Sequence, residues 1–214
     1  MALNIEIYNT IKQELSDNKV TLVAVSKTKP KEDILEAYNN GILDFGENYV
    51  QELVSKYELL PKDIRWHFTG HLQSNKVKFI IPFIHLIHGV DSEKLLAEIN
   101  KQAIKSARKV PCLLQVHISE EETKFGFDEK ELLALNFELY KNVAFFGLMG
   151  MASFSNDTGK IKNEFKKLHT LYTNLQLSHP SFTTLSMGMS ADYKLAIEED
   201  SNMVRIGSLL FGSR

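Results

Sequence analysis

The segment TLVAVSKTKP, residues 21–30, decides the fold that we expect for this chain. It begins with a run of small and β-branched apolar residues, and the run ends in polar residues followed by a proline. This pattern is typical of a buried parallel strand. Because side chains alternate along a strand, Lys27 falls at its carboxyl end on the same face as Val23 and Val25.

Lys27 is therefore a candidate nucleophile. A lysine at the rim of an apolar core is partly desolvated, and desolvation favours the neutral amine that forms a Schiff base. The alternative is an ordinary surface lysine whose ammonium group extends from the strand end into water. The segment alone leaves both interpretations open.

Composition bounds the class of protein. The chain has 214 residues, of which 43% are hydrophobic and 24% charged, and a net charge of -2. These values predict a globular protein and give no reason to expect a nucleic-acid or membrane partner. No apolar run approaches the roughly 20 residues of a membrane span, and the first residues show no signal-peptide pattern. Because Cys112 is the single cysteine, no internal disulfide can form, and we expect a cytoplasmic protein.

Seven more strands are expected after the first, and an amphipathic helical pattern follows each of the eight. Strict alternation of strand and helix means a parallel sheet. Eight such units fit one closed (β/α)8 TIM barrel over residues 1–214, near the short end of the usual range. The alternative is an open doubly wound sheet, which usually has fewer strands. The further strands are expected at 42–45, 65–69, 83–88, 110–118, 143–149, 182–185 and 203–206.

Two glycine-containing turns follow the last two predicted strands, where such barrels commonly bind phosphate. In SMGMS, residues 186–190, Gly188 would permit a close backbone approach and Ser190 would cap the next helix. Gly207 and Ser208 form the second turn. The alternative is that both are merely tight, capped turns. Arg205 lies within the last apolar strand and, being charged, needs either an acidic partner in the barrel or a ligand atom.

The histidines raise the question of a metal site. His67 with His71, and His85 with His88, are close in sequence, but no aspartate or glutamate stands at ligand spacing beside either pair. We therefore predict no metal site. The acidic run at residues 120–122 is expected to be a solvated loop.

Several motifs together resemble the pyridoxal phosphate homeostasis proteins, the YggS/PROSC family. They occur in the family's order and extend over nearly the whole chain. The resemblance implies the fold of the N-terminal barrel of alanine racemases, with pyridoxal 5′-phosphate (PLP) bound as a Schiff base on Lys27. The motifs are VAVSKTKP, FGENYVQE, WHFTGHLQSNK, EETKFGF, GLMGM, LSMGMSADY and VRIGSLLFG.

The resemblance also assigns the remaining cofactor contacts. Asn48 would lie beside the ring and Arg205 would face the pyridine nitrogen. The phosphate would be bound by Ser190 and by the backbone of Gly207 and Ser208, in turns shaped by Ser186 and Gly188. His71, His117 and Ser208 depart from the residues that the family usually has, and Ser208 keeps the hydroxyl group.

These features predict a PLP carrier without catalytic turnover. An arginine cannot accept a proton from the ring nitrogen, so the bound cofactor would be a poor electron sink. The alternatives are a racemase-like enzyme, whose relatives use an additional domain, or a Schiff-base aldolase, for which Glu47 is the only convincing acid. We expect a monomer that delivers PLP, with PLP-dependent apo-enzymes as candidate recipients.

Overall fold

Eight parallel strands close into a barrel, in chain order, in the computed structural model, which describes residues 3–119 and 125–212. Leu22 on the first strand is in register with Val204 on the last, so no edge is left open. The predicted (β/α)8 barrel is confirmed and the open sheet is excluded. The strands are β1 (Thr21–Val25), β2 (Asp44–Glu47), β3 (Arg65–Phe68), β4 (Leu86–Val90), β5 (Val110–Val116), β6 (Val143–Gly150), β7 (Thr184–Met189) and β8 (Met203–Ile206).

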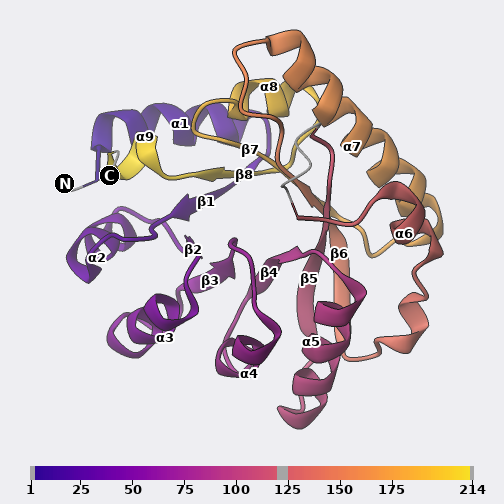
Figure 1. Ribbon diagram of the computed structural model, residues 1–214. Coiled ribbons are helices and arrows are strands. Elements are labelled where there is room, and N and C mark those ends of the chain that lie inside the picture. Colours follow the sequence, from indigo (N-terminus) through magenta and orange to yellow (C-terminus); the bar gives the residue numbers. More distant parts are fainter. Residues whose placement is uncertain (1–2, 120–124, 213–214) are drawn as a thin grey trace.

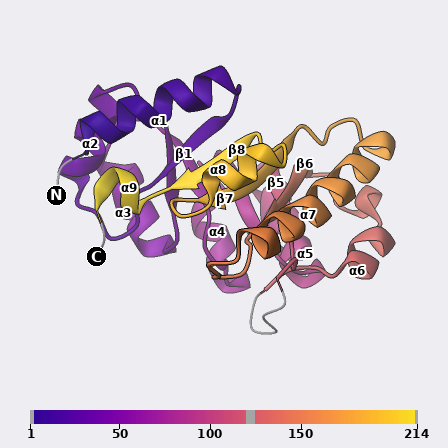
Figure 2. The same cartoon turned by 90° about the horizontal axis from the view of Figure 1, so that it is seen from above.

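Helices surround the strands (Figure 1). They alternate with the strands along the chain, and two short 3-10 turns, η1 (Ser74–Lys76) and η2 (Phe137–Leu139), lie among them. The first and last helices lie side by side in Figures 1 and 2, where the Asn4 amide donates to the Leu210 carbonyl at 2.8 Å. The helices are α1 (Ile5–Asp17), α2 (Lys31–Asn39), α3 (Val50–Leu59), α4 (Val77–Ile80), α5 (Glu93–Lys105), α6 (Glu129–Ala134), α7 (Thr158–Ser178), α8 (Tyr193–Glu198) and α9 (Ser208–Phe211).

The apolar core has two parts because strand side chains alternate between the two faces of the sheet. The larger part lies between strands and helices and includes Phe45, Leu96 and Phe165. The smaller part fills the barrel itself. It consists of Val23, Leu86, Leu113, Met149 and Met203, with Met151 packed against them.

Polar residues share the barrel interior with this smaller cluster. Arg205 is in register with Val23, and His67 with Leu86, so both polar side chains face inward. His88 and Ser186 are also fully buried. Interiors of such barrels are mostly filled with branched apolar residues, so these polar groups must satisfy one another.

Most of the predicted strand boundaries shift by one or more residues, and β7, β2 and β4 shift the most. Strand β7 continues through Met189, because the SMGM segment pairs with β8 across a shift in register instead of forming a turn. Strand β2 begins at Asp44, two residues late. Strand β4 begins only at Leu86, because Phe83 and Ile84 still donate to the Ile80 carbonyl at the end of α4.

Gly147 on β6 lies where the backbone of β7 leaves no space for a side chain. Its φ is +146°, and a Cβ there would lie 1.9 Å from the Thr184 carbonyl oxygen on β7. We expect Gly147→Ala to lower the free energy of unfolding by about 3 kcal/mol, from backbone strain and the forced separation of two strands. Gly41→Ala is the control, since Gly41 has φ +93° but open space around its Cβ position. Urea denaturation would measure both, and equal losses would contradict the proposed strand clash.

Candidate functional site

A cavity of about 540 Å³ opens at the carboxyl ends of β1 and β8. Five of the eight residues predicted from the sequence line it together: Lys27, Asn48, Arg205, Gly207 and Ser208. The other described lining residues are apolar, hydroxyl-bearing or basic. They are Val25, Thr28, Lys29, Thr69, Met151, Met189 and Gly212.

Two lysines line this cavity, and they differ in the hydrogen bonds that their amines make. The Lys29 ammonium donates to the carbonyls of Phe211 (2.7 Å) and Gly212 (3.2 Å), so it stabilises the end of the chain. Lys27 is half-buried and makes no hydrogen bond or ion pair with any residue that the structure describes. Its amine is therefore the one available to react with a ligand in the cavity. We had predicted Lys27 at the end of the strand itself, but β1 ends at Val25 and Lys27 lies in the following turn.

The turn that carries Lys27 is strained. Thr28 has φ 65°, a conformation that β-branched residues rarely adopt. Its amide donates to Glu52 Oε1 at 2.7 Å, and the Ser26 hydroxyl donates to Glu47 Oε1 at 2.6 Å. These two carboxylates of β2 and α3 hold the turn from both sides of Lys27.

Lys56 joins the two carboxylates. Its ammonium donates to Glu47 (2.7 Å), to Glu52 (2.6 Å) and to the Ser26 carbonyl (2.9 Å). Glu47 is fully buried, and its Oε2 has no hydrogen-bond partner among the described residues. Burial raises the pKa of Glu47 to about 7, against the opposing effect of Lys56. Sequence reasoning noted Glu47 only as a possible acid and missed Glu52 and Lys56, because nothing in the sequence shows that they meet below Ser26.

Arg205 is buried, and it lines the cavity from β8. Nη1 donates to the Ser186 carbonyl (2.9 Å) and hydroxyl (2.6 Å), and Nη2 donates to the Gly150 carbonyl (3.0 Å). Burial lowers the pKa of Arg205 to about 10, so the group remains charged near neutral pH. Ser186 thus acts through Arg205 and does not line the cavity itself.

The remaining predicted residues, Ser190 and Gly188, lie beside the cavity. The Ser190 hydroxyl accepts the Gly207 amide at 3.2 Å, which ties the two predicted phosphate turns together. Ser190 was predicted as the cap of α8, but Asp192 occupies that position. A Cβ on Gly188 would lie 2.6 Å from the Ala196 Cβ, so this glycine lets α8 pack closely on β7.

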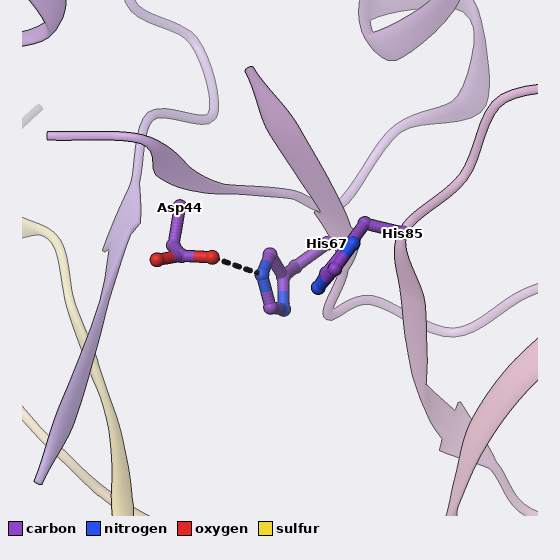
Figure 3. Close-up of side chains that lie close together, drawn as sticks. All are labelled: Asp44, His67 and His85. Carbon is purple, nitrogen blue, oxygen red and sulfur yellow. Dashed lines mark hydrogen bonds and ion pairs between the residues drawn. The ribbon is translucent and has the colours of Figure 1, made fainter. Parts of the chain in front are cut away.

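His67 lies between Asp44 and His85, and each of the three offers a ligand atom within 4.8 Å of the others (Figure 3). In the sequence no acid stands at ligand spacing beside either histidine pair, and the acid of this cluster comes from the neighbouring strand β2. However, Asp44 Oδ1 already accepts from Arg65 Nε at 2.7 Å and lies 3.0 Å from His67 Nε2. A cation would have to displace these groups, and we assign no metal to the cluster.

At the mouth of the barrel, His71 lies 2.8 Å through Nδ1 from Asp91 and stacks on Phe125 at a centroid distance of 4.3 Å. The acidic run at residues 120–122 and the first part of the EETKFGF motif lie outside the described residues. None of the described helices combines the length and apolar character that a membrane span requires.

Over residues 6–214 the chain matches the family model of the alanine racemase N-terminal domain. A pyridoxal phosphate homeostasis protein of Aquifex aeolicus (strain VF5) is 42% identical over 203 residues, which cover 92% of this chain and 89% of that protein. The chain belongs to the pyridoxal phosphate homeostasis protein family. The family predicted from the motifs is confirmed.

Solved structures agree with membership of the pyridoxal phosphate homeostasis family. PipY of Synechococcus elongatus PCC7942 without PLP matches with a TM-score of 0.91 and 35% identity, over 97% of this chain and 99% of PipY. PipY with PLP bound gives a TM-score of 0.88 at 34% identity, over the same shares. An alanine racemase of Clostridium difficile 630 gives 0.77 at 14% identity, over 97% of this chain and 56% of that one, which shows the fold alone.

Glu47 makes the stability of this pyridoxal phosphate homeostasis family member depend on pH. Its folded-state pKa of about 7 lies above the ordinary value of 4.5, so the native state binds the extra proton. This stabilisation is complete below about pH 4.5 and is lost as the pH rises through about 7. We expect the free energy of unfolding to fall by about 2–3 kcal/mol relative to Glu47→Gln between about pH 5 and 8.

Urea midpoints at several pH values would measure this difference. Glu52→Gln is the control, because it removes the other carboxylate bound to Lys56 and should keep the wild-type decline. Parallel curves for the wild type and Glu47→Gln would contradict the assignment.

Proposed function

We propose that this protein binds pyridoxal 5′-phosphate through a Schiff base to Lys27, shields it and delivers it, as part of intracellular PLP homeostasis. The observation that carries the proposal is the uncommitted amine of Lys27 in a cavity that Arg205 and Ser208 also line. A relative that is 42% identical to this chain is named a pyridoxal phosphate homeostasis protein, and PipY has been solved with PLP bound.

The chemistry of the cavity fits this group. The phosphate would be bound by the hydroxyls of Ser190 and Ser208 and by the backbone after β8. Asn48 would lie beside the ring, and the apolar side chains of Met151 and Met189 line the same cavity. When bound, the cofactor supplies an aldehyde that reacts reversibly with amines, which is why cells benefit from keeping it bound.

Arg205 supports binding without turnover. Its side chain donates hydrogen bonds and cannot accept a proton, so at the ring nitrogen it would leave the ring unprotonated. The candidate acid of an aldolase, Glu47, is fully buried under Ser26 and Lys56 and does not line the cavity. The alternative is a racemase-like enzyme or an aldolase, and a measurement of turnover distinguishes it from a carrier.

We further propose that the protein acts as a monomer in the cytoplasm and passes PLP to apo-enzymes. The single cysteine supports the location, since one cysteine cannot form an internal disulfide.

The anchoring lysine can be tested with two matched variants. Purified protein mixed with PLP should show a visible absorption band, and borohydride should fix one adduct on the peptide that contains Lys27. We expect Lys27→Ala to lose the adduct, because no other free amine lines the cavity among the described residues. Lys29→Ala is the control and should keep it. An adduct on Lys29, or one that persists in Lys27→Ala, would disprove the assignment.

Turnover can be tested on the same samples. We expect the PLP-loaded wild type to racemise amino acids and cleave phosphosugars no faster than Lys27→Ala mixed with the same concentration of PLP. Chiral chromatography and an aldehyde-release assay would measure the two rates. A rate at least about tenfold above that of the variant would favour the enzyme alternative.

A further inference from the structure

A continuous chain of hydrogen bonds crosses the barrel interior from Arg205 to Asp44. Arg205 Nη1 donates to Ser186 Oγ at 2.6 Å, and Ser186 Oγ lies 3.2 Å from His88 Nδ1. His88 Nε2 lies 2.8 Å from His67 Nδ1, and His67 Nε2 lies 3.0 Å from Asp44 Oδ1. The five residues come from β8, β7, β4, β3 and β2, so the chain connects most of the barrel.

Two groups of fixed role end this series of hydrogen bonds, a guanidinium group that donates and a carboxylate that accepts. A guanidinium group can only donate, so the Ser186 hydroxyl accepts from Arg205 and keeps its own proton for another acceptor, which is His88 Nδ1 when that nitrogen is unprotonated. An ionised carboxylate can only accept, so His67 Nε2 donates to Asp44. Burial acts to raise the pKa of Asp44, but hydrogen bonds from His67 and Arg65 outweigh it and hold that pKa below the usual range.

The two histidines between these ends fit the same direction when both rings are neutral. Nδ1 of His88 accepts from Ser186 and its Nε2 donates to His67, whose Nδ1 accepts and whose Nε2 donates. Burial lowers the pKa of His67 against the effect of Asp44, and burial lowers the pKa of His88 well below its ordinary value. Each polar hydrogen along the chain therefore has an acceptor.

Arg205 depends on this arrangement because of where its charge lies. Its hydrogen-bond partners among the described residues are one hydroxyl and two carbonyl groups, without a carboxylate. The chain presents the negative end of each dipole toward the guanidinium, and the carboxylate of Asp44 stands at its far end, paired with Arg65. Reversing the chain would aim the His88 Nδ1 proton at Ser186 and leave the hydroxyl accepting from both sides.

We propose that Asp44, His67 and His88 are positioning residues for Arg205, which draw the Ser186 hydroxyl proton toward His88, leave the oxygen lone pairs to Arg205 and so hold the guanidinium group toward the Lys27 cavity. The effect on a bound cofactor rests on the proposed function. The direction of the hydrogen bonds from Arg205 to Asp44, and their effect on Arg205, are independent of that function. Both can be measured without a cofactor.

The direction is tested by long-range ¹H–¹⁵N NMR of the histidine rings in the protein without PLP. We expect both His67 and His88 to carry the proton on Nε2 alone near neutral pH. A proton on Nδ1 of either ring would overturn the proposal, whether or not the protein binds PLP.

The positioning effect is tested with a matched pair of variants. His88→Leu and His88→Asn both lose the contact with His67, but the side-chain oxygen of the introduced asparagine can still accept the Ser186 hydroxyl. We expect the guanidinium N–H signals of Arg205 to exchange with water faster in His88→Leu and to stay slow in His88→Asn. The affinity for PLP, measured by absorption, should fall about tenfold in His88→Leu and much less in His88→Asn.

His85→Leu is the control, because His85 packs near His67 at a centroid distance of 5.2 Å but has no link in the chain. It should behave as the wild type in both measurements. Equal behaviour of the two His88 variants would overturn the proposal, since their difference isolates the contact with Ser186. A wild type that fails to bind PLP would overturn the proposed function only, and the exchange of the Arg205 signals would still decide this inference.

Discussion

The buried guanidinium group of Arg205 is the constraint on which the interior of this barrel depends. A charge inside a barrel is costly unless nearby groups are oriented to stabilise it. Here β7 provides a hydroxyl and a carbonyl at Ser186, and β6 provides the Gly150 carbonyl. The hydroxyl is in turn oriented by His88. His88 is hydrogen-bonded to His67, and His67 to Asp44, on the far side of the barrel. In the sequence these polar side chains look unrelated, but in the barrel they form one hydrogen-bonded network.

A second buried group of charges lies beneath Lys27. Glu47, Glu52 and Lys56 meet there and hold the turn between β1 and α2, including the strained Thr28. Such strain persists only where surrounding contacts determine the backbone fully. The turn that carries Lys27 and the guanidinium group of Arg205 are thus held by separate networks, and the barrel sets the distance between them.

The same architecture serves proteins with different chemistry. An alanine racemase shares this fold at 14% identity, so the barrel alone does not specify what happens in its cavity. What distinguishes this chain is the set of groups that point into the cavity and the groups behind them. Lys29 illustrates the point, since it lines the same cavity as Lys27 but is committed to the carbonyls of Phe211 and Gly212.

The sequence by itself determined the barrel, the family and five of the lining residues, because strand and helix alternation and local motifs are properties of neighbouring positions. The local pattern of apolar and polar residues was enough to place Lys27 and Gly207 close to strand ends. Only the tertiary structure decided that Asp44 meets His67, that Glu47 lies under Ser26 and that His88 reaches Ser186, 98 positions further along the chain. Closing the barrel brings together side chains from strands far apart in sequence, and the register that aligns them follows from the packing of all eight strands at once.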